Sequence, residues 1–439
     1  MPEQAKAPSA WNPRVLIVAE HASAKFGGEA VLPLHFFRFL RQRGVEAWLL
    51  VHGRTQSELA ELLPHEQGRI TYIPDTAMHR LLWRMGKPLP DRVAYFTVGW
   101  LMRLLTQLVQ RRLARQLVRD HRIDVVHQPI PVSPKEPSLM FGLGAPVVIG
   151  PMNGGMDYPP GFSQSQGLLT RSVLGVGRAM AAAFNLVMPG KALASLLLVA
   201  NERTRRALPA TATKRVAVLV ENGVDFNTWR PADTAAEPPH RTPEAPTRFV
   251  FMGRLVDWKA VNLLIEAFHQ AAAQKPMSLT ILGDGQEGAA LRAQAQALGI
   301  LSAEIDEPGH IHFTGWQTQP ECARKLAHSD ALVLPSLMEC GGAVVLEAMA
   351  LGKAVIATDW GGPADYLDAR CGILVPAQNS TQFVKALADA MLKLASEPDV
   401  CQQMGRQGQE KVRAEFDWQR KVDRILELYR GVAPDARSA

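Results

Sequence analysis

Two glutamates and a pair of glycines that follow one apolar run carry the clearest chemistry in this sequence. Residues 331–334 are apolar and predict a buried strand of a parallel sheet. Glu339, Gly341 and Gly342 come next, and a helix-prone run that contains Glu347 follows them. Backbone N–H groups at such a helix start bind anions, and carboxylates bind hydroxyl groups. The segment therefore predicts a site for a ligand that carries both phosphates and hydroxyls, such as a nucleotide-sugar.

Two cations are expected at the same edge of the same sheet. Arg254 and Lys259 come just after another apolar run, 248–253, and the carboxyl ends of parallel strands share one edge. Fixed cations there would stabilise the negative charge that develops on a departing nucleoside diphosphate. The sequence has no D-x-D motif and no His/Cys cluster with ligand spacing, so we expect no metal site.

These residues resemble family 4 of the retaining, nucleotide-sugar-dependent glycosyltransferases (group 1), which have the GT-B fold. Glu339 and Glu347 have that family's E-x7-E spacing, inside the longer pattern P-S-x-x-E-x-x-G-x-x-x-L-E-A-M-A-x-G-K. The family usually has Gly-Phe-Gly after the first Glu, where this chain has Cys340-Gly341-Gly342 and so lacks the apolar Phe contact. Ala260, after Lys259, also stands where the family has Gly.

The resemblance implies roles for individual residues. The expected catalytic residues are His127, Arg254, Lys259 and Glu339. The donor is expected to contact Gly28, Arg254, Lys259, Glu339, Gly341, Gly342, Ala343 and Glu347, with Glu347 on the ribose hydroxyls. No protein nucleophile is implied: the acceptor attacks the face from which the leaving group departs, and the donor phosphate takes the proton. No cofactor is expected besides the donor itself, for which a UDP-sugar is the commonest carrier.

The first half of the chain is expected to bind the acceptor. His127 ends a predicted strand, and the resemblance implies that it orients acceptor hydroxyls; a buried structural histidine is the alternative reading. Gly27 and Gly28 lie in the first strand-to-helix loop, where a Cβ would keep the backbone away from a ligand. Asn153, in the loop 151–155, is also expected on the acceptor side.

Apolar runs and helical patterns alternate in two series, which predicts two Rossmann-like, doubly wound α/β domains facing a cleft, the GT-B arrangement. We expect an N-terminal domain over 1–230, a linker rich in Pro and Ala over 231–246, and a nucleotide-sugar domain over 247–417. The final helix, within 418–439, is expected to pack back on the first domain. The predicted strands are 14–19, 45–51, 124–127, 146–150, 196–200, 216–220, 248–253, 278–282, 310–313, 331–334 and 354–357.

Composition and charge limit the compartment and the kinds of partner that we expect for this chain. The chain has 439 residues, a hydrophobic fraction of 47% and four cysteines without a C-x-x-C pair, which favours a reduced, cytoplasmic protein. We see no signal peptide and no 18-residue apolar run. Residues 1–230 hold 28 Lys and Arg against 16 Asp and Glu, giving +12, whereas the remainder carries −6 of the total of +6. Without a nucleic-acid-binding motif, this asymmetry favours a lipid headgroup surface or a pyrophosphate-linked acceptor.

The sequence therefore predicts a metal-independent, retaining glycosyltransferase that acts on a glycan or polyprenyl-diphosphate-linked acceptor, in exopolysaccharide or cell-envelope glycan synthesis. Two alternatives remain open: a nucleotide-sugar 2-epimerase of the same fold, and a non-catalytic scaffold that binds nucleotide-sugar. We also expect the basic half to dock on an anionic membrane, at its inner face, through cations that lie near Leu and Trp residues. These cations are Arg80, Arg84, Arg111, Arg112, Arg115 and Arg119.

Overall fold

The computed structural model describes residues 11–25, 28–88, 98–165, 183–230 and 245–433. The chain separates into two compact units. The first consists of Met1–Gly155, Ser172–Glu221 and Gln419–Ala439, and the second of Met156–Arg171 and Asn222–Trp418. The boundary after Glu221 comes before residue 230, and nearly all of the predicted linker, 231–246, lies outside the described residues.

The first unit is built on a parallel seven-stranded sheet with the order β3-β2-β1-β4-β5-β6-β7. Its strands are β1 (Arg14–Val18), β2 (Glu46–His52), β3 (Ile70–Ile73), β4 (Val125–Gln128), β5 (Val147–Met152), β6 (Leu196–Val199) and β7 (Val216–Val218). Every residue of β4, β5 and β6 is buried, as expected for central strands that are covered on both faces.

Helices cover this sheet, and several begin and end where the sequence requires it. They are α1 (Gly28–Gln42), α2 (Gln56–Leu62), α3 (Ala77–Gly86), α5 (Val98–His121), α7 (Gly190–Leu193), α8 (Glu202–Arg206) and, except for its first residue, α16 (Trp418–Arg430). Gly44 ends the turn after α1 with φ +74°, a conformation that favours glycine. Short 3₁₀ helices η1 (Gly53–Thr55) and η2 (Pro64–Arg69) flank α2.

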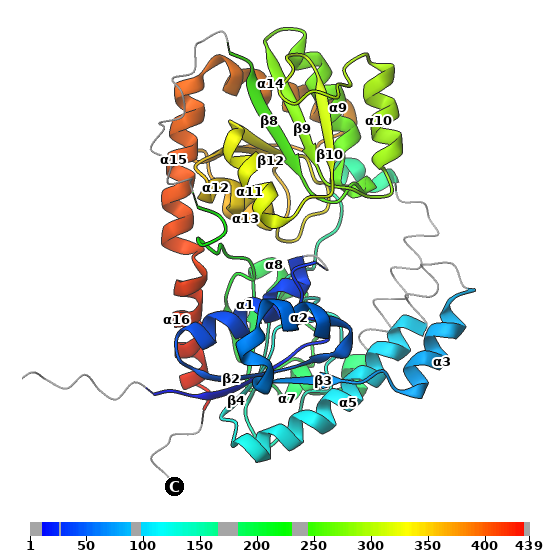
Figure 1. Cartoon of the computed structure of the whole chain (residues 1–439), viewed down its shortest axis with the longest axis vertical. Helices are drawn as coiled ribbons and strands as arrows, with labels where there is room; N and C mark the ends of the chain where they lie inside the picture. The colour runs from blue at the N-terminus through cyan, green and yellow to red at the C-terminus, as the bar shows by residue number, and fades with distance from the viewer. Residues whose placement is uncertain (1–10, 26–27, 89–97, 166–182, 231–244, 434–439) are drawn as a thin grey trace, which may run out of the picture. The chain divides into compact units, whose positions relative to one another are not determined.

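The second unit has a six-stranded parallel sheet with the order β10-β9-β8-β11-β12-β13 (Figure 1). The strands are β8 (Thr247–Met252), β9 (Met277–Leu282), β10 (Ile311–Gly315), β11 (Ala331–Leu334), β12 (Ala354–Thr358) and β13 (Gly372–Val375). The helices are η3 (Pro160–Ser165), η4 (Asp257–Lys259), α9 (Val261–Ala272), α10 (Gly288–Ala297), α11 (Gln319–His328), α12 (Ala343–Ala350), α13 (Gly362–Tyr366), α14 (Ser380–Ser396) and α15 (Pro398–Glu415). The predicted α/β class, with two doubly wound domains, is confirmed.

A short piece of the first half of the chain belongs to the second unit. Phe162 packs edge-on against Phe383 with ring centroids 5.9 Å apart, and the Trp360 indole donates a hydrogen bond to the Asp157 carbonyl at 2.8 Å. A Cβ at Gly161 would lie only 1.3 Å from the Gln378 carbonyl oxygen, so the backbones touch there. These contacts explain why the residues after Gly155 are not part of a continuous N-terminal domain ending at residue 230.

Candidate donor site

The predicted donor residues follow the two strands at which the second sheet changes direction. β8 and β11 are hydrogen-bonded neighbours, and the chain winds outward from them, to β9 and β10 on one side and to β12 and β13 on the other. At such a switch point the loops after the two strands diverge and leave a crevice at the carboxyl edge, where α/β sheets bind ligands. Arg254 and Lys259 follow β8, and Glu339 and Gly342 follow β11.

A backbone hydrogen bond ties the two loops together, since the Leu337 N–H donates to the Trp258 carbonyl at 2.9 Å. This link places Lys259 beside Glu339, and the Lys259 ammonium forms an ion pair with Glu339 Oε2. Both side chains are mostly buried, with 13% and 16% exposure. The predicted phosphate-binding cation and the predicted hydroxyl-binding acid are therefore within reach of a single ligand.

Arg254 has a different environment. It is exposed at the end of β8, and within the described part of the chain its guanidinium has no hydrogen bond or ion pair. The backbone before it is fixed, because Gly253 has φ +158° and donates its N–H to the Leu282 carbonyl at 3.0 Å. The arginine therefore extends from a rigid strand end with all five of its donors available for an anion.

The loop Cys340-Gly341-Gly342, which we call the glycine loop, keeps the one glycine that its backbone requires. Gly342 has φ +80° and ψ +59°, a left-handed conformation, and directly precedes α12 at Ala343. Cys340 has no positive φ, which explains how it can replace the first glycine of the family pattern. The Gly362 N–H donates to the Glu339 carbonyl at 2.8 Å and holds the loop from the other side. The start of α12 therefore presents its N–H groups from a fixed backbone, next to Lys259 and Glu339.

Glu347, one turn into α12, has an unusual carboxyl group. Burial raises its pKa from the ordinary value of 4.5 to about 8. Among the described residues, none forms a hydrogen bond or ion pair with this carboxyl, so no partner offsets the cost of burying it. Its negative charge also contributes, after burial itself, to the raised pKa of Cys322 on α11. Glu347 is therefore close to α11, which packs against α12.

His127 does not have the environment that was predicted for it. The ring is fully buried, its Nε2 lies 2.5 Å from the Gly150 carbonyl oxygen, and its Nδ1 lies 2.7 Å from the Tyr429 hydroxyl. Since a carbonyl only accepts, Nε2 carries the proton and Nδ1 accepts from the tyrosine. Burial lowers the pKa of His127 to about 4, so the ring is neutral. With both nitrogens engaged, the expected role in orienting acceptor hydroxyls is wrong for this structure, and the structural alternative fits.

Asn153 and Gly28, the other two site residues predicted in the first unit, have different environments. Asn153 is buried, donates from Nδ2 to Glu221 Oε1 at 2.6 Å and accepts from the Thr204 hydroxyl at 3.3 Å, so its amide holds two loops together instead of facing an acceptor. Gly28 is the first residue of α1, and a Cβ there would meet nothing within 4 Å, so packing inside the unit does not require a glycine. Gly27 lies outside the described residues.

One group of titratable side chains was missed by the sequence analysis. Glu20 and His21 follow β1, His52 ends β2, and Asp75 follows β3, so all four lie at the carboxyl edge of the first sheet. His52 Nε2 is 3.4 Å from Asp75 Oδ1, to which Arg54 also donates at 3.0 Å. Burial lowers the pKa of His52 to about 4. Their positions after strands were visible in the sequence for β1 and β2, but β3 was not predicted.

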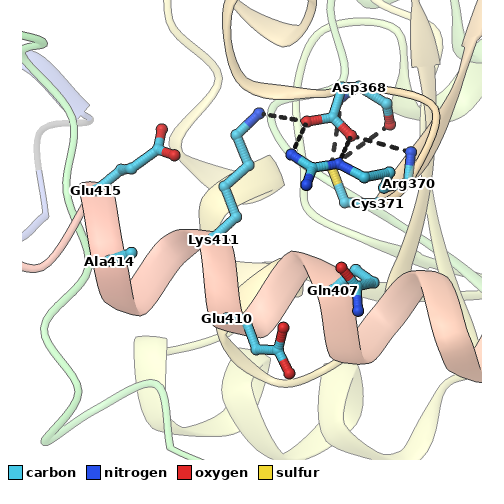
Figure 2. Close-up of a pocket in the computed structure, with 8 residues that line it drawn as sticks. All are labelled: Asp368, Arg370, Cys371, Gln407, Glu410, Lys411, Ala414 and Glu415. Carbon is cyan, nitrogen blue, oxygen red and sulfur yellow. Dashed lines mark hydrogen bonds and ion pairs between the residues drawn. The ribbon is translucent and has the colours of Figure 1, made fainter.

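A pocket of about 230 Å³ lies elsewhere in the second unit (Figure 2). Three of its lining residues, Asp368, Arg370 and Cys371, come just before β13, at the amino-terminal edge of the sheet, whereas the donor residues lie at the carboxyl edge. Lys411 extends from α15 to the Asp368 carboxylate at 3.1 Å. Hydrogen bonds from Arg370, with Lys411, hold the pKa of Asp368 well below its usual range. Three of its charged groups, Asp368, Arg370 and Lys411, pair with one another, so we assign it no ligand. Its lining residues are Asp368, Arg370, Cys371, Gln407, Glu410, Lys411, Ala414 and Glu415.

Two general features of the described residues bear on function. Within them, no three His, Cys, Asp or Glu side chains come together in a way that could hold a metal ion. None of the helices in this part of the chain has the length and apolar character needed to cross a membrane.

Comparison with known proteins finds a family match over the part of the chain that contains these residues. Residues 233–411 match the family model of the group 1 glycosyl transferases. The chain is 30% identical over 238 residues to alpha-maltose-1-phosphate synthase of Mycolicibacterium smegmatis, which covers 52% of this chain and 60% of the relative. It is 29% identical over 226 residues to D-inositol 3-phosphate glycosyltransferase of Streptomyces bingchenggensis, covering 50% of this chain and 48% of the relative. The matches thus span only about half the length of these relatives.

Solved structures with a similar fold extend over nearly the whole chain. HepE of Anabaena in complex with UDP aligns with a TM-score of 0.63 and 16% identity, covering 95% of this chain and 100% of HepE. WaaG, a glycosyltransferase involved in lipopolysaccharide biosynthesis, aligns with a TM-score of 0.60 and 16% identity, covering 95% and 100%. The match to the group 1 glycosyl transferase family therefore covers residues 233–411, and the chain as a whole has the GT-B fold of these structures.

Proposed function

We propose that this protein transfers a sugar from a nucleoside-diphosphate sugar to a glycan or lipid-linked acceptor, with retention of anomeric configuration and without a metal ion. One observation carries the proposal: Lys259 and Glu339 lie side by side at the switch point, next to the first turn of α12 and the unpaired Arg254. A phosphate-binding helix start, two cations and a hydroxyl-binding acid are the groups that such a donor requires.

The mechanism follows from the charges of these groups. When the donor binds, its diphosphate can replace Glu339 as the partner of Lys259, and the released carboxylate can accept hydrogen bonds from sugar hydroxyls. As the glycosidic bond breaks, negative charge grows on the diphosphate, and Arg254, Lys259 and the N–H groups of α12 stabilise it. These fixed groups supply the charge compensation that a divalent ion supplies in other transferases, which supports metal independence.

The acceptor is proposed from charge. The excess of +12 over residues 1–230 favours an acceptor that carries phosphate, such as a polyprenyl-diphosphate-linked glycan in exopolysaccharide or cell-envelope synthesis. Both curated relatives have a phosphorylated compound in their names, which is consistent with a phosphate-bearing acceptor. A UDP-sugar is the donor that we propose to test first, because HepE binds UDP.

The test measures sugar transfer with purified protein and a panel of nucleotide-sugars. Lys259→Ala and Arg254→Ala are each expected to lower the turnover number by roughly 10²–10³, since each removes one contact to the developing charge. Lys275→Ala, an exposed cation after α9, serves as the matched control and should leave the rate unchanged. Activity should survive EDTA, and NMR should show the product with the anomeric configuration of the donor.

Three results would contradict the proposal. Near-wild-type rates in both variants would remove the cations from the mechanism. Inactivation by EDTA with rescue by Mg²⁺ or Mn²⁺ would exclude metal independence, and an inverted product would exclude retention. Product analysis without an acceptor separates the two alternatives, because an epimerase would convert the donor itself and a scaffold would leave it intact.

We further propose that the first unit docks on an anionic membrane, through α3. Met78, Leu81 and Met85 recur at helical spacing and are 51%, 51% and 55% exposed, and Trp83 is 55% exposed. The helix has no acidic residue, and Arg80 and Arg84 lie among these apolar side chains. An exposed apolar stripe beside a basic stripe is typical of helices that lie in a membrane interface.

We propose a smaller part in docking for α5 than the sequence analysis did, because two of its arginines have partners within the first unit. Arg111 donates to the Phe141 carbonyl at 3.1 Å and lies over the Phe141 ring, and Arg115 donates to the Gly142 carbonyl at 2.9 Å. These two guanidinium groups are therefore used inside the unit. Arg80 and Arg84 of α3 lie beside exposed apolar side chains, so α3 is the better candidate for contact with lipid.

A further inference from the structure

Glu58 is a buried carboxylate whose role the donor site does not explain. It lies in the first turn of α2 and is 7% exposed. Its Oε2 accepts from the Ser23 hydroxyl at 2.7 Å, and its Oε1 accepts from the Ala24 N–H at 2.8 Å. Within the described part of the chain, this carboxylate has no other hydrogen bond and no ion pair. Both of its partners therefore belong to the segment that follows β1.

The carboxylate is not needed to hold α2 in place. Leu59, the next residue of the helix, is fully buried, and the Gln67 side-chain amide donates to the Leu59 and Leu63 carbonyls, both at 3.0 Å. Burying a carboxylate costs free energy that an apolar side chain in the same position would not cost. Only the bonds to residues 23 and 24 offset this cost, so the segment after β1 is what Glu58 fixes.

This segment, residues 19–25, which we call the β1 segment, lies at the switch point of the first sheet. β1 pairs with β2 on one side and with β4 on the other, and the sheet extends from them to β3 and to β7. At a switch point the loops after the two strands diverge at the carboxyl edge, where α/β sheets bind ligands. The β1 segment therefore has in the first unit the position that the loop with Arg254 and Lys259 has in the second.

Hydrogen bonds to buried side chains fix the β1 segment although its end is exposed. The Ser23 hydroxyl is fully buried and also accepts from the Lys25 N–H at 3.0 Å, and the Ser23 N–H donates to the Ala30 carbonyl of α1 at 2.9 Å. Ala24 and Lys25 are exposed, yet their N–H groups are bonded to Glu58 or to Ser23. A surface segment held in this way has the fixed backbone that a precise binding site requires.

Polar side chains on the β1 segment give it something to position. Glu20 and His21 are 26% and 31% exposed, and the Glu20 Oε1 lies 3.6 Å from the His21 Nε2. Groups of this kind form hydrogen bonds with the hydroxyls or phosphates of a ligand. A backbone shift of about 1 Å is enough to take such groups out of hydrogen-bonding distance.

We propose that Glu58 is a positioning residue for sugar transfer, which holds the β1 segment in the conformation that receives the acceptor and does not itself touch the substrate. This inference rests on the proposed function and on acceptor binding by the first unit. The cations and the helix start proposed for the donor diphosphate belong to the second unit. Loss of the Glu58 carboxylate should therefore impair transfer and leave the binding of UDP unchanged.

The experiment measures transfer and UDP binding in the same full-length variants. Glu58→Ala removes both bonds and should lower kcat/KM for transfer by roughly 10²-fold, the scale of a misplacement by about 1 Å. Its affinity for UDP, measured by isothermal titration calorimetry, should equal that of the wild type. Glu58→Gln should keep most of the transfer rate, because the amide can still accept from the Ala24 N–H and can donate to the Ser23 hydroxyl.

Two control variants on α2 separate positioning from a loss of stability. Glu61→Ala removes an exposed carboxylate of the same helix and should change neither measurement. Leu59→Ala creates a cavity under α2 and should lower the melting temperature, but it should transfer sugar at the wild-type rate at temperatures where it is folded. Hydrogen exchange at the Ala24 and Lys25 amides should be faster in Glu58→Ala than in the wild type and in Leu59→Ala.

Four results would overturn the inference. They are wild-type transfer by Glu58→Ala, an equal loss of transfer in Leu59→Ala, a loss of UDP affinity as large as the loss of transfer, and unchanged exchange at Ala24 and Lys25. If Glu58→Ala does not fold, Ser23→Ala, which removes one of the two bonds, replaces it, and wild-type transfer by that variant would count against the inference in the same way. A wild type that transfers sugar from no nucleotide-sugar would refute the proposed function, and this inference with it.

Discussion

Glu347→Gln should change how the stability of the chain depends on pH. The glutamine has nearly the same shape but cannot ionise, so the variant isolates the cost of charging the buried carboxyl. In the unfolded chain this group ionises near pH 4.5, whereas in the folded chain its pKa is about 8. Below pH 4.5 it is neutral in both states, and the substitution should have little effect through charge.

Between pH 4.5 and about pH 8 the wild type should lose stability as the pH rises, because only the unfolded chain releases the proton of Glu347. The loss should be complete above pH 8. A pKa raised from 4.5 to about 8 corresponds to about 5 kcal/mol, which is an upper limit because Glu347 is only partly buried. Above pH 8 the variant should therefore have the larger free energy of unfolding, by up to about 5 kcal/mol.

The assay is urea denaturation of wild type and variant from pH 4.5 to 9, reported as the difference between the two proteins at each pH. The difference cancels every other titrating group that both proteins share. Glu266→Gln on the exposed face of α9 is the matched control and should show a difference that does not change with pH. If the difference for Glu347→Gln is equally flat, the carboxyl ionises as an exposed one does, and the burial argument is refuted.

Two further predictions concern α3 and Ala260. Binding to anionic vesicles should fall steeply between low and high salt, and Leu81→Ser with Trp83→Ser should weaken it without changing UDP affinity; equal binding to neutral vesicles would contradict docking by charge. Ala260 has φ +50°, a conformation that costs a residue with a Cβ roughly 1–2 kcal/mol. Relief of this strain by Ala260→Gly is partly offset, because glycine has more conformational freedom in the unfolded chain. The substitution should therefore leave the free energy of unfolding unchanged or raise it by up to about 1 kcal/mol. Ala267→Gly, in the middle of α9, should lower it by about 1 kcal/mol, and an equal loss from both substitutions would show that Ala260 is not strained.

The sequence predicted most strands because central parallel strands are continuous apolar runs. The predicted strand 331–334 has the observed bounds of β11, whose four residues are all buried. β3 and β13 were missed, and both are four-residue strands at the edge of a sheet with two half-buried residues in the middle. An edge strand is covered less completely, so its sequence lacks the apolar continuity that marks a central strand.

The proximity of two predicted donor residues follows from chain-local rules. Lys259 and Glu339 follow adjacent strands, and the shared edge of a parallel sheet brings them together. His127 also ends a strand, but its environment depends on Tyr429, which lies 302 positions later. A local pattern gives the position of a side chain along a strand, but it does not reveal which distant segment will cover that side chain.

The contact between His127 and Tyr429 also constrains the order in which the protein can fold during synthesis. Most of the first unit leaves the ribosome before the second unit, yet α16, which completes the first unit, is translated after the second. Besides Tyr429, this helix contributes Lys421, whose ammonium is buried and donates to the carbonyls of Val220 and Glu221 at 2.7 and 2.9 Å. Until α16 arrives, His127 Nδ1 and these two carbonyls lack these partners. A nascent chain that ends before α16 should therefore hold an unfinished first unit beside a second unit that already has all of its strands.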